Sequence, residues 1–137
     1  MFNRRSFTFV LILAGCSRPD DTAQIEKQLD LYAGYARTNN YFGMASLFAE
    51  DGVLESNIRG PKAIQQHLAA NTGLKVVEYS IDPEKPTVKG DTAEQSVVYQ
   101  QQLRTPQGST TQLTGRLKIT WVRASSDRWL ISSLTTS

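Results

Sequence analysis

The sequence predicts an α+β fold in which three helices come first and an antiparallel sheet follows. Apolar residues recur with helical spacing up to about residue 73, whereas the chain beyond it alternates with a period of two. Across residues 110–123 apolar and polar side chains alternate, which is typical of a sheet with one covered face and one solvated face. Because the helices precede the strands, we expect all three to pack on one face of a curved sheet.

The first helix is predicted from Thr22, a residue type that favours the N-cap, to about Asn39. Positions spaced by three or four residues place an apolar stripe on one face of this helix. The stripe consists of Ile25, Leu29, Tyr32 and Ala36. This face is therefore expected to lie against the sheet.

The second helix is predicted to be short, from Tyr41 to about Ala49, with Phe42 among its largely buried residues. The dipeptide Asp51-Gly52 is a turn signal, so the chain should change direction there. Residues 53–56 then alternate in polarity and are predicted to form a short strand.

Gly60-Pro61 opens the third helix, since proline is tolerated in the first turn of a helix. We expect this helix to end near residues 71–73, where Gly73 can adopt the left-handed conformation of a C-cap. The strands expected after it are, in order, residues 74–82, 87–89, 93–105, 110–123 and 128–134.

Residues 1–15 have the pattern of a signal peptide, with two arginines before an apolar run. The run is far shorter than the roughly 20 residues that a membrane-spanning helix needs. It closes with Leu13-Ala14-Gly15-Cys16, which resembles the lipobox of bacterial lipoproteins. The resemblance implies that Cys16 is the lipid attachment site and that the protein is anchored to a membrane outside the cytoplasm. In a Gram-negative cell, Ser17 after that cysteine implies the periplasmic face of the outer membrane.

Paired arginines followed by Phe7 also resemble the twin-arginine export motif, and both this route and the general secretory route stay open. Residues 16–21 are interpreted as a short tether and residues 22–137 as one domain, a length that suits a single core.

Composition excludes several classes of partner. Residues 1–15 hold two of the 15 Lys and Arg and none of the 13 Asp and Glu, so the remaining chain has a formal net charge of zero. Without a block of like charge, nucleic acid is not an expected partner. The chain has one cysteine and one histidine, which argues against a metal site, and we expect no cofactor.

Three stretches together resemble the NTF2-like superfamily, in its SnoaL-like and ketosteroid-isomerase-like branch. They are Ala-Ser-Leu-Phe-Ala-Glu-Asp-Gly-Val at residues 45–53, Gly-Pro-Lys-Ala-Ile at residues 60–64, and the closing hairpin at residues 121–131. The resemblance covers residues 22–136 and implies a cone, in which a bent sheet wraps the long helix around an apolar cavity. That family uses the cavity for isomerases, dehydratases and hydrolases and also for binding and dimerisation, so the resemblance indicates a fold and not a reaction.

The isomerase chemistry of that family needs an aspartate base, a tyrosine and a protonated aspartate. On the resemblance, Tyr32 falls at the family's first-helix tyrosine and Ser56 falls where the base aspartate stands. Serine accepts no proton near neutral pH without a base beside it, and residues 111–123 contain no acid. We therefore expect no steroid-type isomerisation, and no catalytic set is identified.

Candidate cavity-lining residues are Tyr32, Ser56, His67, Tyr99 and Gln101. The Tyr32 hydroxyl can orient a ligand, or it can belong to a core aromatic bonded to the backbone. Tyr99 and Gln101 share one face of a strand and would offer polar groups in an apolar pocket. His67 can shuttle a proton near neutral pH, or it can be a half-exposed structural residue.

The sequence favours a lipid-anchored domain that binds a small apolar ligand or a protein partner. Two alternatives stay open. A lyase, isomerase or hydrolase would need Tyr32, His67 and Glu55 to converge in one cavity. A homodimer, or a structural subunit of an envelope complex, would have a filled cavity and an exposed apolar patch on its sheet.

Overall fold

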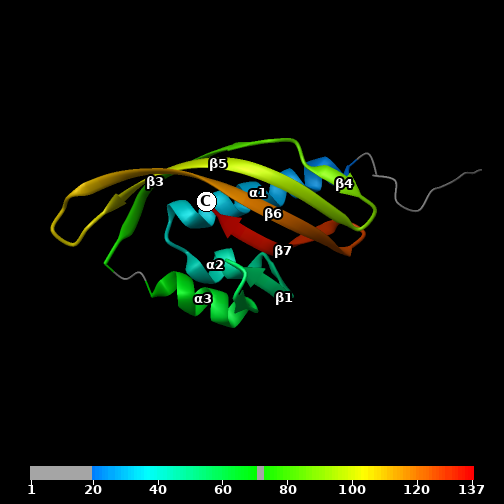
Figure 1. Ribbon diagram of the computed structural model, residues 1–137, viewed down its shortest axis with the longest axis horizontal. Helices are drawn as coiled ribbons and strands as arrows, with labels where there is room; N and C mark the ends of the chain where they lie inside the picture. The colour runs from blue at the N-terminus through cyan, green and yellow to red at the C-terminus, as the bar shows by residue number, and fades with distance from the viewer. Residues whose placement is uncertain (1–19, 71–72) are drawn as a thin grey trace, which may run out of the picture.

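The computed structural model describes residues 20–70 and 73–137 (Figure 1). The elements are α1 (Asp21–Arg37), α2 (Tyr41–Ser46), β1 (Phe48–Leu54), β2 (Ile58–Arg59), α3 (Pro61–Ala69), β3 (Lys75–Pro83), β4 (Thr87–Lys89), β5 (Thr92–Arg104), β6 (Thr110–Ser125) and β7 (Arg128–Thr136). This order confirms the predicted α+β class. The predicted signal peptide, Cys16 and residues 17–19 of the predicted tether lie outside the described residues.

The strands form one curved sheet in the order β2-β1-β7-β6-β5-β3, with β4 paired to β5. The long strands β5 and β6 arch over the three helices, as Figure 1 shows. All strand pairs are antiparallel except β1 and β7, which run parallel. A wholly antiparallel sheet was predicted, and this part of the prediction is wrong. Parallel neighbours need a long connection, and here the chain between β1 and β7 passes through α3 and five other strands.

Helix α1 begins one residue before the predicted N-cap, because Asp21 is drawn into the interior. Asp21 is fully buried, and its carboxylate accepts from Arg123 Nη1 at 2.8 Å and from Nη2 at 3.0 Å. Arg123 also donates to Asp91 at 2.9 Å and lies 4.5 Å from the ring centroid of Trp129. The apolar stripe predicted for this helix is buried, as expected. One guanidinium therefore fastens the start of α1 to β6 and β7.

The chain between α2 and β1 differs most from the sequence prediction. Helix α2 ends at Ser46, and Asp51-Gly52 is not a turn but part of β1. A Cβ on Gly52 would meet the Ile131 carbonyl oxygen at 2.8 Å, so glycine is needed where β1 approaches β7 this closely. The exposed fraction of the Phe42 side chain is 69%, which contradicts the prediction that it is buried.

The segment predicted as a strand at residues 53–56 is cut short. Strand β1 ends at Leu54, and Glu55 and Ser56 have φ values of 53° and 71°, in the left-handed region. Helix α3 follows Gly60-Pro61 as predicted. Its C-cap is Ala70 and Gly73 has no positive φ, so the predicted glycine cap is wrong.

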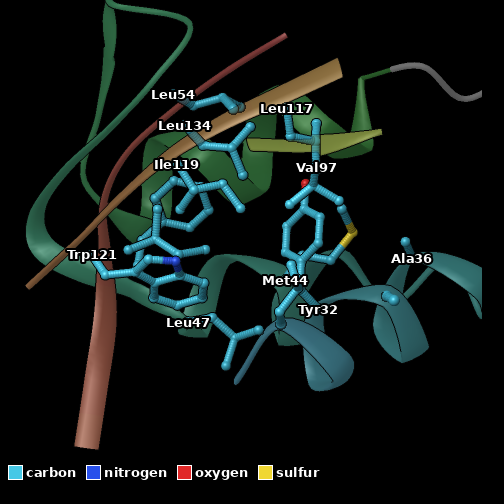
Figure 2. Packing of buried hydrophobic residues seen from close by; sticks show 14 of the residues in the cluster. Tyr32, Ala36, Met44, Leu47, Leu54, Val97, Leu117, Ile119, Trp121 and Leu134 are labelled. Carbon is cyan, nitrogen blue, oxygen red and sulfur yellow. The ribbon is translucent and has the colours of Figure 1, made fainter. Parts of the chain in front are cut away.

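The core lies between the helices and the inner face of the sheet (Figure 2). Trp121 and Trp129 are fully buried. The Trp121 indole N–H donates to Gln95 Oε1 at 3.1 Å, and Gln95 Nε2 donates to the Glu84 carbonyl at 2.8 Å. Among the described residues, those of the buried core lie between positions 25 and 134, so a fragment that begins at residue 17 retains all of them. Within the described part of the chain, no helix has the length and apolarity needed to cross a bilayer.

Candidate functional site

A cavity of about 370 Å³ opens between the second half of α1, helices α2 and α3, and the inner face of the sheet. This volume lies in the range of small-molecule pockets. Its aliphatic walls include Leu68, Leu74, Val76, Leu103, Leu113 and Leu117. Leu74 and Leu113 are 37% and 42% exposed, so these two side chains mark the mouth. The cavity is thus an apolar hollow that opens beside the β5–β6 hairpin.

Among the described lining residues, every aromatic side chain is a tyrosine. The chain has five tyrosines, and four of them line the cavity: Tyr32, Tyr41, Tyr79 and Tyr99. Figure 2 shows Tyr32 reaching from α1 toward the strands that carry Val97 and Leu117. The rings of Tyr79 and Tyr99 are stacked, with centroids 5.9 Å apart and planes 14° apart.

The position of Tyr99 depends on a glycine on the neighbouring strand. Gly115 is paired with Tyr99 across β5 and β6, and a Cβ at Gly115 would lie 2.6 Å from the Tyr99 hydroxyl oxygen. The Tyr99 ring therefore packs against the backbone of β6 at Gly115, where no side chain intervenes. Tyr79 was not among the residues singled out by sequence. It lines the cavity beside Gln101, with which it is paired across β3 and β5. The sequence signal that could have found it is the alternation of Val77, Tyr79 and Ile81 with polar residues.

Burial sets the protonation state of these tyrosines. Loss of solvation is the main cause that raises the pKa of Tyr32, Tyr79 and Tyr99 above the ordinary value. All three groups are therefore neutral at physiological pH and can donate a hydrogen bond. Among the described residues, none forms a hydrogen bond with any of the three hydroxyls. The Tyr32 hydroxyl is thus not bonded to backbone there, which was the structural alternative for this residue.

A carboxylate lies next to this cavity. Glu55 follows β1, and its backbone N–H donates to the Leu134 carbonyl at 2.9 Å. Its side chain accepts from the Thr136 backbone N–H at 3.0 Å and from the Thr136 hydroxyl. Thr136 itself lines the cavity. The charge of Glu55 is a second cause of the raised pKa of Tyr32 and of Tyr99.

The structure brings some of the predicted site residues together and separates others. Tyr32, Tyr99 and Gln101 line the cavity. Ser56 and His67 are exposed and do not line it, contrary to expectation. Ser56 lies in the turn after β1, whereas His67 is on a side of α3 that differs from the cavity-lining side of Leu68.

The three residues that an enzyme was expected to bring together do not share the cavity, because Tyr32 lines it whereas His67 and Glu55 do not. Within residues 20–70 and 73–137, no group of three or more acidic, histidine or cysteine side chains is placed to hold a metal ion. The arrangement can bind an apolar molecule and donate hydrogen bonds to it from neutral hydroxyls. Glu55 is not among the lining residues, and it contacts the lining through Thr136.

Comparisons with known proteins bear on the fold. A family model described as a SnoaL-like domain matches residues 17–135. A ketosteroid isomerase-like protein from Erwinia carotovora atroseptica is 12% identical, with a TM-score of 0.78 over 88% of this chain and 97% of that one. A protein of unknown function from Mycobacterium tuberculosis is 22% identical, with a TM-score of 0.71 over 84% and 74% of the two chains.

A candidate scytalone dehydratase from Novosphingobium aromaticivorans is 19% identical, with a TM-score of 0.68 over 83% of this chain and 80% of that one. A search of curated protein sequences found no match. At these identities, the similarity to solved structures establishes the fold and leaves the activity open.

Proposed function

The chain belongs to the SnoaL-like domain family, and we propose that it is a lipid-anchored protein that binds a small, largely apolar molecule in the tyrosine-lined cavity. The observation that carries this proposal is the set of three neutral hydroxyls, on Tyr32, Tyr79 and Tyr99, that have no hydrogen-bond partner among the described residues. A hydrogen bond of this kind contributes about 0.5–1.5 kcal/mol net. A ligand that accepts from these hydroxyls and covers the aliphatic walls would gain that free energy together with the free energy of burying apolar surface.

The enzymatic alternative is weaker on the same geometry. Of the three residues that it needs, His67 is exposed and outside the cavity. Glu55 is close enough to affect Tyr32, but both of its carboxylate oxygens accept hydrogen bonds from Thr136. A carboxylate held in this way is better suited to shape the local field than to take a proton from a substrate.

A lipid anchor at Cys16 would set how the cavity mouth is oriented relative to the membrane. Helix α1 begins at the end of the molecule that carries the β6–β7 turn, whereas the cavity opens toward the β5–β6 hairpin at the other end (Figure 1). From Asp21 to Ala36 the helix rises about 22 Å. Cys16 precedes Asp20 by a stretch of chain that spans at most about 14 Å. The mouth would therefore face away from the anchoring membrane, toward molecules in the surrounding compartment.

Native mass spectrometry of residues 17–137, purified from the host of the protein, tests the binding proposal. We expect a retained small molecule in the native chain. A Leu103→Trp variant, which adds bulk to the cavity wall, should lose the small molecule. A Leu130→Trp variant is the matched control, because Leu130 lies on the outer face of β7, between two buried neighbours. A native chain with the mass of the bare polypeptide, or equal retention by both variants, would contradict the proposal.

Membrane fractionation tests the anchor separately. We expect the native chain in the membrane fraction and a Cys16→Ser variant in the soluble extracytoplasmic fraction. Equal distribution of the two proteins would show that Cys16 is not the attachment site, and it would leave the cavity proposal unaffected.

A further inference from the structure

We propose that the cavity selects a neutral secondary amide, in which the amide group joins two apolar parts, and that the side chain of Gln101 makes this selection. The inference rests on the proposed function, because it names the ligand class for the same cavity. Three features carry it: the place of Gln101 in the cavity wall, the hydrogen-bonding groups that its side chain adds, and the walls from which the polar groups enter.

Gln101 is a half-buried polar residue in the sheet wall of the cavity. Side chains alternate between the two faces along β5, so Leu103, Gln101 and Tyr99 share the inner face, with about 7 Å between successive positions. Strand pairing places Gln101 directly opposite Tyr79 on β3 and Leu113 on β6, both of which also line the cavity. The amide of Gln101 therefore lies in the same hollow as the stacked tyrosine rings.

Apolar side chains line the cavity on both sides of this amide. Toward the β5–β6 hairpin the wall continues with Leu103 and with Leu74, which marks the mouth. Toward the interior it continues with Leu117 and Met44, which are buried. A ligand that fills the cavity would therefore carry its polar group in its middle, with an apolar part on either side. This arrangement fits an internal amide better than a terminal one.

The side chain of Gln101 adds an acceptor to a set of donors. Among the described residues, none forms a hydrogen bond with this side chain. A ligand that covers Gln101 removes its amide from water, so both the Nε2 donors and the Oε1 acceptor then need partners on the ligand. A ligand carbonyl can accept from Nε2 or from a tyrosine hydroxyl, but it leaves Oε1 unpaired. A ligand N–H next to that carbonyl pairs with Oε1 as well, and a site built in this way discriminates against analogues that lack the N–H.

The polar groups enter the cavity from two opposite walls. Tyr32 comes from α1 and reaches toward the sheet, as Figure 2 shows, whereas Gln101 comes from β5 in the sheet itself. In a trans secondary amide the C=O and the N–H point in opposite directions. One amide lying between helix and sheet can therefore accept from the Tyr32 hydroxyl and donate to Gln101 Oε1.

The lining also favours a ligand without charge. No Lys, Arg, His, Asp or Glu is among the described residues that line the cavity. An ionised group in this hollow would lose its hydration without gaining an opposite charge. An amide supplies a donor and an acceptor and stays neutral, so it meets both requirements of the site.

The test is an NMR titration of residues 17–137 with three probes of the same length: N-butylbenzamide, butyl benzoate and 1-phenylhexan-1-one. The probes differ only in the group after the carbonyl, which is N–H, oxygen or CH₂. We expect the ratio of amide affinity to ester affinity to be about three- to tenfold higher in the native domain than in a Gln101→Met variant, the effect of one net hydrogen bond. The ketone should behave as the ester does, and the side-chain N–H resonances of Gln101 should shift most with the amide.

Gln100→Met is the matched control, because Gln100 is the next residue along β5 and is exposed outside the cavity. It should keep the affinity ratio of the native domain. If Gln101→Met has the native ratio, or if Gln100→Met lowers the ratio equally, the amide proposal is overturned while binding in the cavity stands. If none of the three probes binds the native domain, both proposals fail. If the NMR spectrum shows that Gln101→Met is unfolded, Gln101→Leu takes its place in the same comparison.

Discussion

Gly115 offers the sharpest test of the cavity geometry, through replacement by alanine. The added Cβ would lie 2.6, 2.7 and 2.8 Å from the hydroxyl oxygen, Cζ and Cε1 of Tyr99. These distances are well inside van der Waals contact, so the ring must leave its place beside Tyr79. Overpacking of this kind costs about 1–3 kcal/mol. For a domain of this size, each kcal/mol shifts Tm by roughly 4 °C, so Tm should fall by about 4–12 °C.

Gly34→Ala is the matched control, with an effect of the opposite sign. Gly34 lies in the last turn of α1, and a Cβ there meets nothing within 4 Å. Alanine should therefore stabilise the domain by about 0.5–1 kcal/mol, since it has the higher helix propensity. Urea unfolding of residues 17–137, followed by tryptophan fluorescence, measures both changes in the free energy of unfolding.

A double-mutant cycle then isolates the clash. Tyr99→Leu removes the three atoms that the new Cβ would meet, so Gly115→Ala should cost little in that background. The coupling energy should account for most of the loss measured in the native background. If Gly115→Ala is equally destabilising with and without the tyrosine ring, the ring does not occupy the place described here, and the cavity floor is built differently.

The remaining predictions concern pH, a buried ion pair and a helix cap. Burial raises the pKa of Tyr32 and Tyr79, so the unfolded chain loses these protons at a lower pH than the folded chain. Above about pH 10 the free energy of unfolding should therefore fall by about 1.4 kcal/mol per pH unit for each of the two residues. Urea unfolding midpoints between pH 9 and 11 measure this loss of stability, and Tyr32→Phe should make the midpoint fall less steeply with pH. A midpoint that does not change with pH would contradict the prediction. Arg123→Met should cost about 3–5 kcal/mol in urea unfolding, because it removes the guanidinium that pairs with buried Asp21; a loss below about 1 kcal/mol would refute this. Asn40→Ala should lower the free energy of unfolding by about 1 kcal/mol, because the Asn40 side chain caps α2 by accepting from the Gly43 backbone N–H. An unchanged Tm would show that the cap does not contribute to stability.

The candidate site was only partly accessible to sequence reasoning. Tyr32 and Tyr99 could be found because each lies on an apolar face whose period is visible along the chain. Glu55 could not be placed, because its neighbour Thr136 is 81 positions away and its left-handed backbone conformation is not encoded by a glycine. His67 stood out as the only histidine, but rarity in the sequence carries no information about which side of α3 faces the cavity.

Local patterns in the sequence were sufficient to determine the division into helices and strands and the buried face of α1, since periodicity depends only on neighbouring residues. Tertiary contacts decided the rest. The pairing of Asp21 with Arg123 spans 102 positions, and the parallel contact of β1 with β7 draws Gly52 into a strand where the local sequence favours a turn. Such contacts join segments that are remote along the chain, and their free energy outweighs local conformational preference. The cavity and the carboxylate beside it are products of that long-range packing.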